Sequence, residues 1–527
     1  MDKLRFLDAS FLYLETPDTP MNIASVQMLA LPAGTSATSF CQAQAQHIEA
    51  RLGHLPVLTK RLLETPLGMD HPVWIEAANF DLNRHLQQRT LQAPGNRWQL
   101  EDLVARLHEQ PLPRDQPLWQ FTLIDGLGPD HCNDCDNPSN TAVLYCKYHH
   151  ACIDGMAGQS IIDVLFSTDP ARPTATRPRQ PAKTKAPGTL ELLRDAGRTL
   201  WQQSSGAGSN LAERLQAAQR LGGRWWRGQG ELGALGDGVP KTPFNTSASP
   251  YRTWAMASLP LQDIRNLGKT QGASINDMVM AICALAVRRY LLRHHALPAQ
   301  PLRCGVPVSL RSADDPGMNN QVTMLMASMD TSSDDPLVCL AALQASMATG
   351  LAVTRDTQTL TSGDLHLPGL ATALQAMVRL YGATGLAAML PPVVNLVVSN
   401  VKGPRRPMYL CGARMLTHYP VSIASHGATM NITVQSYCER IDFGITACLE
   451  AVPDVRSLRD DLTAAWQDLR AAVLAANSPG PGSRSEISAG ATSEAQAGNT
   501  AAAAAAPGMG PAYSLAAEWG AQRAAQG

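Results

Sequence analysis

Short stretches in which apolar side chains dominate or alternate with polar ones mark the strands that the sequence predicts. Three of them lie in the first third of the chain, are rich in Val, Leu, Tyr and Phe, and are bounded by Pro, Gly or Asn: residues 24–31, 119–125 and 142–148. Later strands are predicted at residues 304–311, 395–400 and 430–437, and helical periodicity at residues 276–293 and 455–475. This mixture of helices and strands predicts an α/β fold.

The chain is too long for one hydrophobic core, so its 527 residues are expected to divide into parts. From residue 168 the composition shifts to Pro, Ala, Thr and basic residues, which is typical of an extended linker, and a helix-forming stretch follows. After Asn477, Gly, Ser, Ala and Pro dominate and indicate a disordered tail. The predicted parts are an N-terminal α/β subdomain, a basic and Pro-rich linker with a crossover helix, a C-terminal α/β subdomain and the tail, at residues 1–167, 168–242, 243–476 and 477–527.

The overall composition excludes several classes of protein. Hydrophobic residues make up 45% and charged residues 17%, as in a folded chain, and the formal net charge of −1 provides no basic field for nucleic acid. The N-terminal segment carries acidic residues inside its apolar stretches, unlike a secretory signal, and no window supplies the roughly 20 apolar residues of a spanning helix. The eleven cysteines follow no framework spacing, which favours free thiols and a cytoplasmic location.

Two adjacent tryptophans lie among arginines in the linker. Trp225 and Trp226 belong to the segment RLGGRWWR, residues 220–227. This mixture suits the interface of a membrane or lipid droplet, to which the protein would bind peripherally. The same tryptophans could equally pin the crossover helix to the body of the protein, and both interpretations stay open.

The string KYHHACIDGM at residues 147–156 carries the candidate chemistry. It follows the strand-like TAVLYCKY and precedes the helical AGQSIIDVLF, which predicts a strand-to-helix turn. Successive strand side chains point to opposite faces, so His149 and His150 are not expected to enter one cleft together. One histidine is therefore expected to react and the other to be structural. An imidazole that titrates near neutral pH can take a proton from an attacking hydroxyl and return it to a thiolate, as acyl transfer from a thioester requires.

The residues after the histidines are expected to shape the turn rather than to react. Asp154 stands where a helix N-cap would stand, and it could also pair with a buried arginine, for which Arg311 is a candidate. Gly155 offers the backbone freedom of a tight turn. Cys152 has no visible activating group, so direct transfer without an acyl-enzyme is the simpler mechanism.

A polar loop at residues 128–138 contains one Cys-x-x-Cys pair. A structural zinc ion needs about four ligands, whereas His131, Cys132 and Cys135 crowd one side with no second pair in sight. No metal site is expected, and the loop is interpreted as a surface feature.

The string His-His-x-x-x-Asp-Gly resembles the active-site motif of the coenzyme A-dependent acyltransferase superfamily, which includes chloramphenicol acetyltransferase and the condensation domains of peptide synthetases. Further segments narrow the resemblance to the bacterial wax ester synthase/diacylglycerol acyltransferase family, in family order from about residue 4 to residue 475. They are LDASFL at 7–12, PMN at 20–22, PLW at 117–119, GL at 126–127, ND at 276–277, VPVSLR at 306–311 and NLVVSNVKGP at 395–404.

This resemblance implies two chloramphenicol-acetyltransferase-like subdomains with mixed sheets, joined by the helical crossover linker, with an active-site tunnel between them. It also implies O-acyl transfer from acyl-coenzyme A, as co-substrate, to diacylglycerol or a long-chain alcohol, giving triacylglycerol or wax ester with no bound cofactor. The resemblance assigns the general base to His150, supporting roles to His149 and Asn276, a structural ion pair to Asp154 and the turn to Gly155.

Several of these residues have a competing structural interpretation. Asn276 and Asp277 could cap the helix that follows them, which is the preferred interpretation for Asp277. The Pro-Leu-Trp corner at 117–119 is physically a packing device, and a structural role is expected for it. The phosphates of the coenzyme could meet either the basic residues at 172–185 or the group formed by Lys402, Arg405 and Arg406.

Two other functions compete with fatty acyl transfer to a lipid alcohol. A condensation-type acyltransferase would use the same base on another acceptor. A non-catalytic lipid-droplet binding protein would need the tryptophan-arginine segment and not the histidines.

Overall fold

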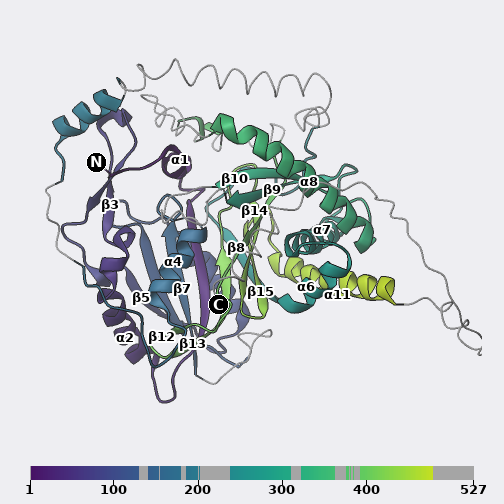
Figure 1. The fold of residues 1–527 in the computed structure, drawn as a ribbon, viewed down its shortest axis with the longest axis horizontal. Helices are drawn as coiled ribbons and strands as arrows, with labels where there is room; N and C mark the ends of the chain where they lie inside the picture. Colours follow the sequence, from purple (N-terminus) through teal and green to yellow (C-terminus); the bar gives the residue numbers. More distant parts are fainter. Residues whose placement is uncertain are drawn as a thin grey trace, which may run out of the picture. The chain divides into compact units, whose positions relative to one another are not determined.

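The computed structural model of the chain describes residues 2–129, 140–153, 155–179, 186–199, 201, 238–309, 322–361, 376–378, 380–381, 384 and 392–478. All the described helices and strands belong to one compact unit that ends at Asn477. Two six-stranded sheets form its centre, each packed against helices (Figure 1). The predictions for the Cys-x-x-Cys loop, for Trp225 and Trp226, and for the tail concern segments that lie outside the described residues.

The first sheet comes mainly from the N-terminal part of the chain. Its strands lie in the order β12 (Tyr409–Leu410), β13 (Ala413–Val421), β2 (Asn22–Ala30), β7 (Thr141–His149), β6 (Trp119–Asp125) and β5 (Leu86–Thr90). Only β5 and β6 run parallel among these neighbours. Alternate residues of β7 enter two different cores, because Leu144 and Cys146 pack in one and Val143 and Tyr145 in the other. β7 is therefore a central, doubly buried strand.

Helices cover both faces of this sheet. The helices α1 (Phe6–Leu14), α2 (Ala37–Glu49) and α4 (Gly155–Leu165) share the core of Leu144, and α3 (Arg97–Glu109) shares the core of Tyr145. A small sheet of β1 (Asp2–Lys3), β4 (Val73–Glu76) and β3 (Lys60–Leu63) lies beside them. Single 3-10 turns occupy Leu52–His54, Pro56–Leu58, Pro66–Gly68 and Leu82–Arg84.

The second sheet comes from the C-terminal part of the chain. Its order is β10 (Val322–Met329), β9 (Leu302–Ser309), β11 (Leu396–Val401), β14 (Met430–Tyr437), β15 (Arg440–Cys448) and β8 (Arg252–Pro260). β11 runs parallel to both its neighbours, and the other pairs are antiparallel. The helices α6 (Leu261–Thr270), α7 (Ile275–Arg293), α8 (Pro336–Thr361) and α11 (Val455–Asn477) pack on it. The prediction of an α/β fold with two mixed sheets is confirmed.

The two halves are interlocked by the chain itself. After β11 in the second sheet, the chain crosses over and adds β12 and β13 to the edge of the first sheet. The crossing is tight, because a side chain at Gly444 of β15 would overlap the carbonyl of Pro420 in β13. The segment 243–476 therefore contributes to both halves, which its assignment to a single C-terminal subdomain did not anticipate.

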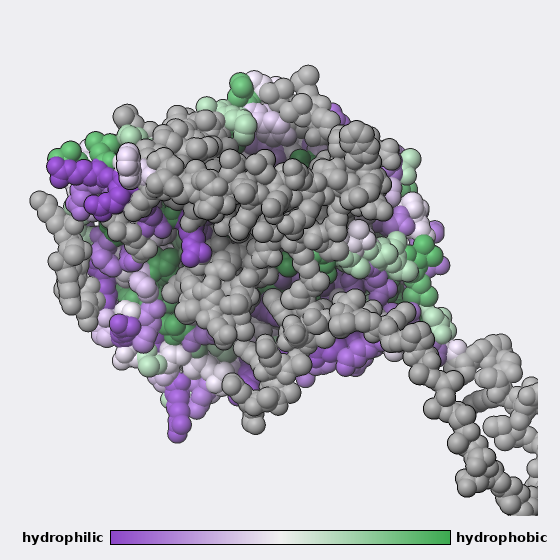
Figure 2. All heavy atoms as spheres, turned by 45° about the horizontal axis from the view of Figure 1, so that its top comes forward, coloured by the Kyte–Doolittle hydropathy of each residue, from purple (hydrophilic) through white to green (hydrophobic). Residues whose placement is uncertain are grey.

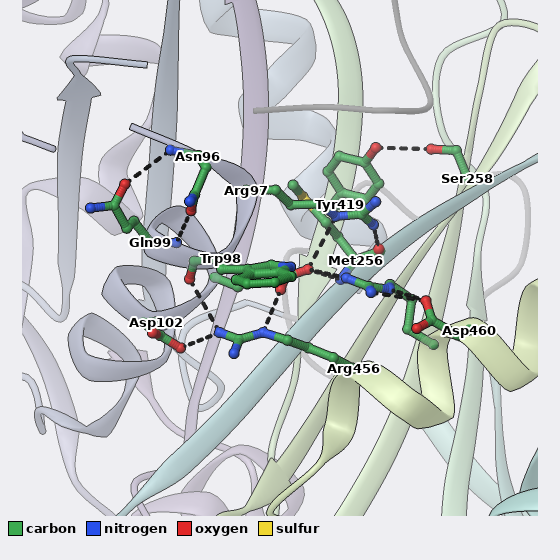
Figure 3. A network of polar contacts seen from close by, with 12 residues as sticks. Asn96, Arg97, Trp98, Gln99, Asp102, Met256, Ser258, Tyr419, Arg456 and Asp460 are labelled. Carbon is green, nitrogen blue, oxygen red and sulfur yellow. Dashed lines mark hydrogen bonds and ion pairs between the residues drawn. The ribbon is translucent and has the colours of Figure 1, made fainter. Parts of the chain in front are cut away.

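A helix of the first half also covers an open edge of the second sheet. β8 is an edge strand, so alternate backbone groups point away from β15. In α3, Arg97 donates to the carbonyl of Met256 (Figure 3). Glu101 accepts the N–H of Met256 at 3.2 Å, and Glu109 accepts the N–H of Arg252 at 2.8 Å. The polar side chains of α3 thus take the place of a further strand.

No helix in the described part of the chain has the length and apolar character that crossing a membrane demands.

Candidate active site

The two adjacent histidines lie where β7 ends. The backbone N–H of His149, the last residue of β7, donates to the carbonyl of Leu118 at 3.0 Å, and the N–H of His150 donates to the carbonyl of Met21 at 2.8 Å. The chain then turns, with the N–H of Cys152 donating to the carbonyl of His149 at 3.0 Å, before α4 begins. The predicted strand-to-helix turn is confirmed, and neighbouring segments fix the backbone of both histidines.

The side chain of His149 is buried, and both of its ring nitrogens lie close to protein groups. Its Nδ1 accepts the backbone N–H of Ala151 at 3.0 Å, which places the ring proton on Nε2. Nε2 lies 3.3 Å from Oε1 of Glu15. The carboxylate of Glu15 also accepts from Arg114 at 2.8 Å and from the backbone N–H of Met21 at 3.2 Å. These contacts hold His149 in one orientation, as expected of the structural member of the pair.

The ring of His150 has a different environment. It is half-buried, and it stacks on the ring of Phe11 with 4.0 Å between the ring centroids and 9° between the planes. Phe11 lies on α1, and Glu15 is the residue directly after the last residue of this helix. α1 and the residue that follows it therefore contact both histidines.

Glu15 should make the stability of this site depend on pH. Burial raises the pKa of Glu15, but its contacts with His149 and Arg114 outweigh burial and lower the pKa to about 2. The ionised Glu15 carboxylate therefore stabilises the folded protein above pH 4.5, and this stabilisation is lost as the pH falls toward 2. At neutral pH the stabilisation amounts to about 3 kcal/mol. We expect Glu15→Gln to lower the free energy of unfolding by about that amount at pH 7, and by clearly less at pH 3.5, in urea titrations.

Glu64→Gln is the matched control for this prediction. Glu64 approaches the same Arg114 at 3.6 Å, but its side chain is 75% exposed. An exposed ion pair contributes at most about 1 kcal/mol, so this variant should stay close to the wild type. A Glu15→Gln effect that is equally large at pH 7 and pH 3.5 would contradict the linkage.

Of Asp154 and Gly155, the two residues predicted to shape the turn after the histidines, the structure describes only Gly155. Asp154 and its candidate partner Arg311 lie outside the described residues, so their ion pair stays a prediction. Gly155 is the first residue of α4, directly after the turn.

The Asn-Asp pair begins α7 in the second half of the molecule. Ser274 caps the helix, its Oγ accepts the N–H of Asp277 at 3.2 Å, and the carboxylate of Asp277 accepts the N–H of Ser274 at 2.8 Å. Asp277 is thus a capping residue, as preferred from the sequence. Asn276 is half-buried next to it, and no hydrogen bond joins it to His149 or His150 among the described residues. Its supporting role stays a prediction.

The Pro-Leu-Trp corner acts as packing. Trp119 is buried, its indole N–H donates to the carbonyl of Leu58 at 2.8 Å, and its ring stacks on His85 with 4.4 Å between centroids. The carbonyl of Leu118 accepts the backbone N–H of His149, so this corner also helps to hold the end of β7.

The described residues contain no group of three His, Cys, Asp or Glu side chains arranged to hold a metal ion. Free cysteines occur instead, and six of those described are buried.

Phe11, Glu15 and Arg114 belong to the site but were not singled out from the sequence as site residues. Glu15 and Arg114 are 99 positions apart, and the histidines follow Phe11 by about 140 residues.

The architecture defines a first, broad class. The first condensation domain of the calcium-dependent antibiotic synthetase has the same fold, with a TM-score of 0.52 at 15% identity over 89% of this chain and 96% of that chain. The chain therefore shares the fold of condensation domains.

Sequence comparison then gives the family. The model of the wax ester synthase/diacylglycerol acyltransferase catalytic domain matches residues 4–279, and that of the WS/DGAT C-terminal domain matches residues 318–470. The chain belongs to the wax ester synthase/diacylglycerol acyltransferase family, and the resemblance noted in the sequence is confirmed.

Individual relatives agree with this assignment. A putative diacylglycerol O-acyltransferase of Mycobacterium tuberculosis is 31% identical over 489 residues, 89% of this chain and 90% of the relative. The O-acyltransferase WSD of Acinetobacter baylyi is 29% identical over 87% of this chain and 94% of its own. The solved wax ester synthase/diacylglycerol acyltransferase of Marinobacter aquaeolei superimposes with a TM-score of 0.63 at 25% identity, covering 90% of this chain and 100% of that chain.

Proposed function

We propose that the protein transfers a fatty acyl group from acyl-coenzyme A to the hydroxyl of diacylglycerol or of a long-chain alcohol, with His150 as the general base. The observation that carries the proposal is the unequal environment of the two histidines. His149 is buried at the end of β7 with Nε2 beside the carboxylate of Glu15, whereas the His150 ring lies on the turn beyond the strand, half-buried and stacked on Phe11. Family membership and the names of the relatives support acyl transfer to a lipid hydroxyl.

In the proposed reaction, the alcohol gives its proton to the imidazole of His150 while its oxygen attacks the carbonyl carbon of the thioester. The tetrahedral intermediate collapses, the C–S bond breaks, and the imidazolium returns the proton to the departing thiolate. One alcohol and one thioester become one ester and one free coenzyme A, and the base is neutral again. Asn276 or backbone N–H groups would stabilise the oxyanion.

Direct transfer is favoured over an acyl-enzyme by the state of the nearest thiol. Cys152 lies on the same turn as the histidines, and burial raises the pKa of its thiol well above the usual range. The thiolate that an acyl-enzyme would need is therefore scarce at neutral pH.

The two substrates are proposed to reach His150 from opposite mouths of a tunnel between the halves. His150 comes from the first half and Asn276 from the second, which supports a site at their junction. Only an arrangement of this kind lets a coenzyme and a long hydrocarbon meet at one base without sharing an entrance.

Because the acceptor is insoluble in water, the protein is also proposed to bind a membrane or lipid-droplet surface peripherally. Leu190 and Trp201, 62% and 76% exposed, offer apolar side chains for shallow contact. Figure 2 shows the described hydrophobic residues of one face in separate groups between hydrophilic ones. Sedimentation with triolein droplets, compared with Trp201→Ser, tests this contact, and unchanged sedimentation of the variant speaks against it.

The deciding experiment supplies palmitoyl-coenzyme A with hexadecanol, with dipalmitoylglycerol, or with no acceptor, and follows free thiol and lipid product. Thiol release that requires an alcohol and matches the ester formed supports direct O-acyl transfer. A burst of thiol without acceptor would indicate an acyl-enzyme. No release with either alcohol would favour a condensation-type acceptor or a binding protein.

A further inference from the structure

Helix α1 is packed into the core of the first half. Ala9, Leu12 and Tyr13 are buried in the core of the first half, and the hydroxyl of Tyr13 lies 2.7 Å from Nδ1 of His71. Phe11 is half-buried on another side of the helix. Its ring is therefore presented to the turn after β7 by an element that cannot easily move.

The stacking geometry restrains the His150 ring itself. A parallel stack at 4.0 Å is kept only while the imidazole stays in one plane, so rotation of the ring costs the contact. The face of an aromatic ring is also electron-rich and attracts a cation above it. The Phe11 ring thus favours the protonated imidazole, which is the form that the base acquires when the alcohol is attacking.

We propose that Phe11 is a positioning residue for the general base, which fixes the plane of the His150 imidazole and stabilises the imidazolium formed during transfer. This inference rests on the proposed role of His150. Phe11 acts only through His150, so it should affect the chemical step and not the binding of acyl-coenzyme A.

Charged and titratable groups lie near this corner. They are Asp8 on α1, Glu15 directly after α1, Lys147 and His149 on β7, Cys152 on the turn, and Arg114 on the segment before β6. Glu15 is paired with His149 and Arg114. A changed titration of His150 is therefore attributed to the ring only when a variant that keeps the ring does not show it.

The test is Phe11→Leu, which keeps an apolar side chain and removes the flat ring. With palmitoyl-coenzyme A and hexadecanol, kcat should fall about 5- to 50-fold, with KM for the thioester within about twofold. The base works when neutral, so the rate rises as the pH passes its pKa. Losing the ring lowers that pKa, and the acid limb of the kcat profile should move to lower pH by about half a unit to one unit.

Two further variants separate positioning from packing. Phe11→Tyr keeps the ring, so the acid limb of the kcat profile should stay at the same pH and kcat should stay within about twofold of the wild type. Phe6→Leu removes the same atoms from the same helix, at a ring that contacts His71 with 6.0 Å between centroids, and should leave kcat and the limb unchanged. Thermal unfolding of all three variants shows whether a loss of activity is caused by a loss of folded protein.

The inference is overturned if folded Phe11→Leu keeps the wild-type kcat and acid limb, if Phe11→Tyr loses as much as Phe11→Leu, or if Phe6→Leu shows the same change. His150→Ala, measured in parallel, shows whether a negative result concerns only the role of Phe11 or also the proposed role of His150. An active His150→Ala removes the base itself from the mechanism, whereas an inactive His150→Ala beside an unchanged Phe11→Leu removes only the role of Phe11.

Discussion

Replacing His150 by alanine should abolish nearly all acyl transfer and leave the protein folded. A positioned general base contributes about 10²- to 10⁴-fold to a rate, so kcat with palmitoyl-coenzyme A and either alcohol should fall by that factor. The ring lies on a half-buried turn beyond β7, so its loss should change the free energy of unfolding by no more than about 1 kcal/mol. Steady-state thiol release, urea unfolding and partial recovery of activity with added imidazole are the measurements.

The matched control is another half-buried histidine of the same half. A ring nitrogen of His47 lies 2.8 Å from the carbonyl of Leu165, at the far end of α4 from the His-His turn. His47→Ala should therefore keep the wild-type kcat. His149→Ala should lose stability as well as activity, because its loss leaves Glu15 without one partner. A folded His150→Ala variant with more than a third of the wild-type kcat means that another group is the base.

Local pattern was enough to predict the strands that build the site. The apolar runs at 119–125 and 430–437 coincide with β6 and β14, and β7 extends the predicted run by one residue at each end, to Thr141 and His149. Alternation along that strand also predicted that the two histidines would not enter one cleft together, and the division of their roles stays a prediction. These features depend on side chains within one segment, which the sequence displays directly.

Contacts between distant segments could not be predicted in the same way. Nothing in the composition of 409–421 shows that β12 and β13 leave the second sheet for the edge of the first. The pairing of Glu15 with His149 and the stack of Phe11 on His150 likewise depend on where α1 lies after folding. The residues quoted for the resemblance included Phe11, but a family motif does not state what a residue touches.

The second large effect is expected at Glu101, on the seam between the halves, where α3 of the first half contacts β8 and α11 of the second. Its carboxylate is fully buried and lies 3.3 Å from Nε of Arg97, 3.1 Å from Nε of Arg456 and 3.4 Å from a terminal nitrogen of Arg459. Arg456 and Arg459 come from α11 in the second half, so the carboxylate of Glu101 binds arginines of both halves. Removing it leaves three positive charges and the N–H of Met256 without their shared partner.

Glu101→Ala should therefore lower the free energy of unfolding by about 3–5 kcal/mol, the usual cost of removing one partner from a buried ion pair. Urea unfolding measures it. Asp102→Ala is the control, because Asp102 binds the same Arg456 at 2.5 Å from a side chain that is 57% exposed, and should cost no more than about 1 kcal/mol. If the two variants were equally stable, the seam would be held by apolar packing alone. A large loss at Glu101 only would mean that α3 fastens the edge of β8, and with it the second half, to the half that carries His150.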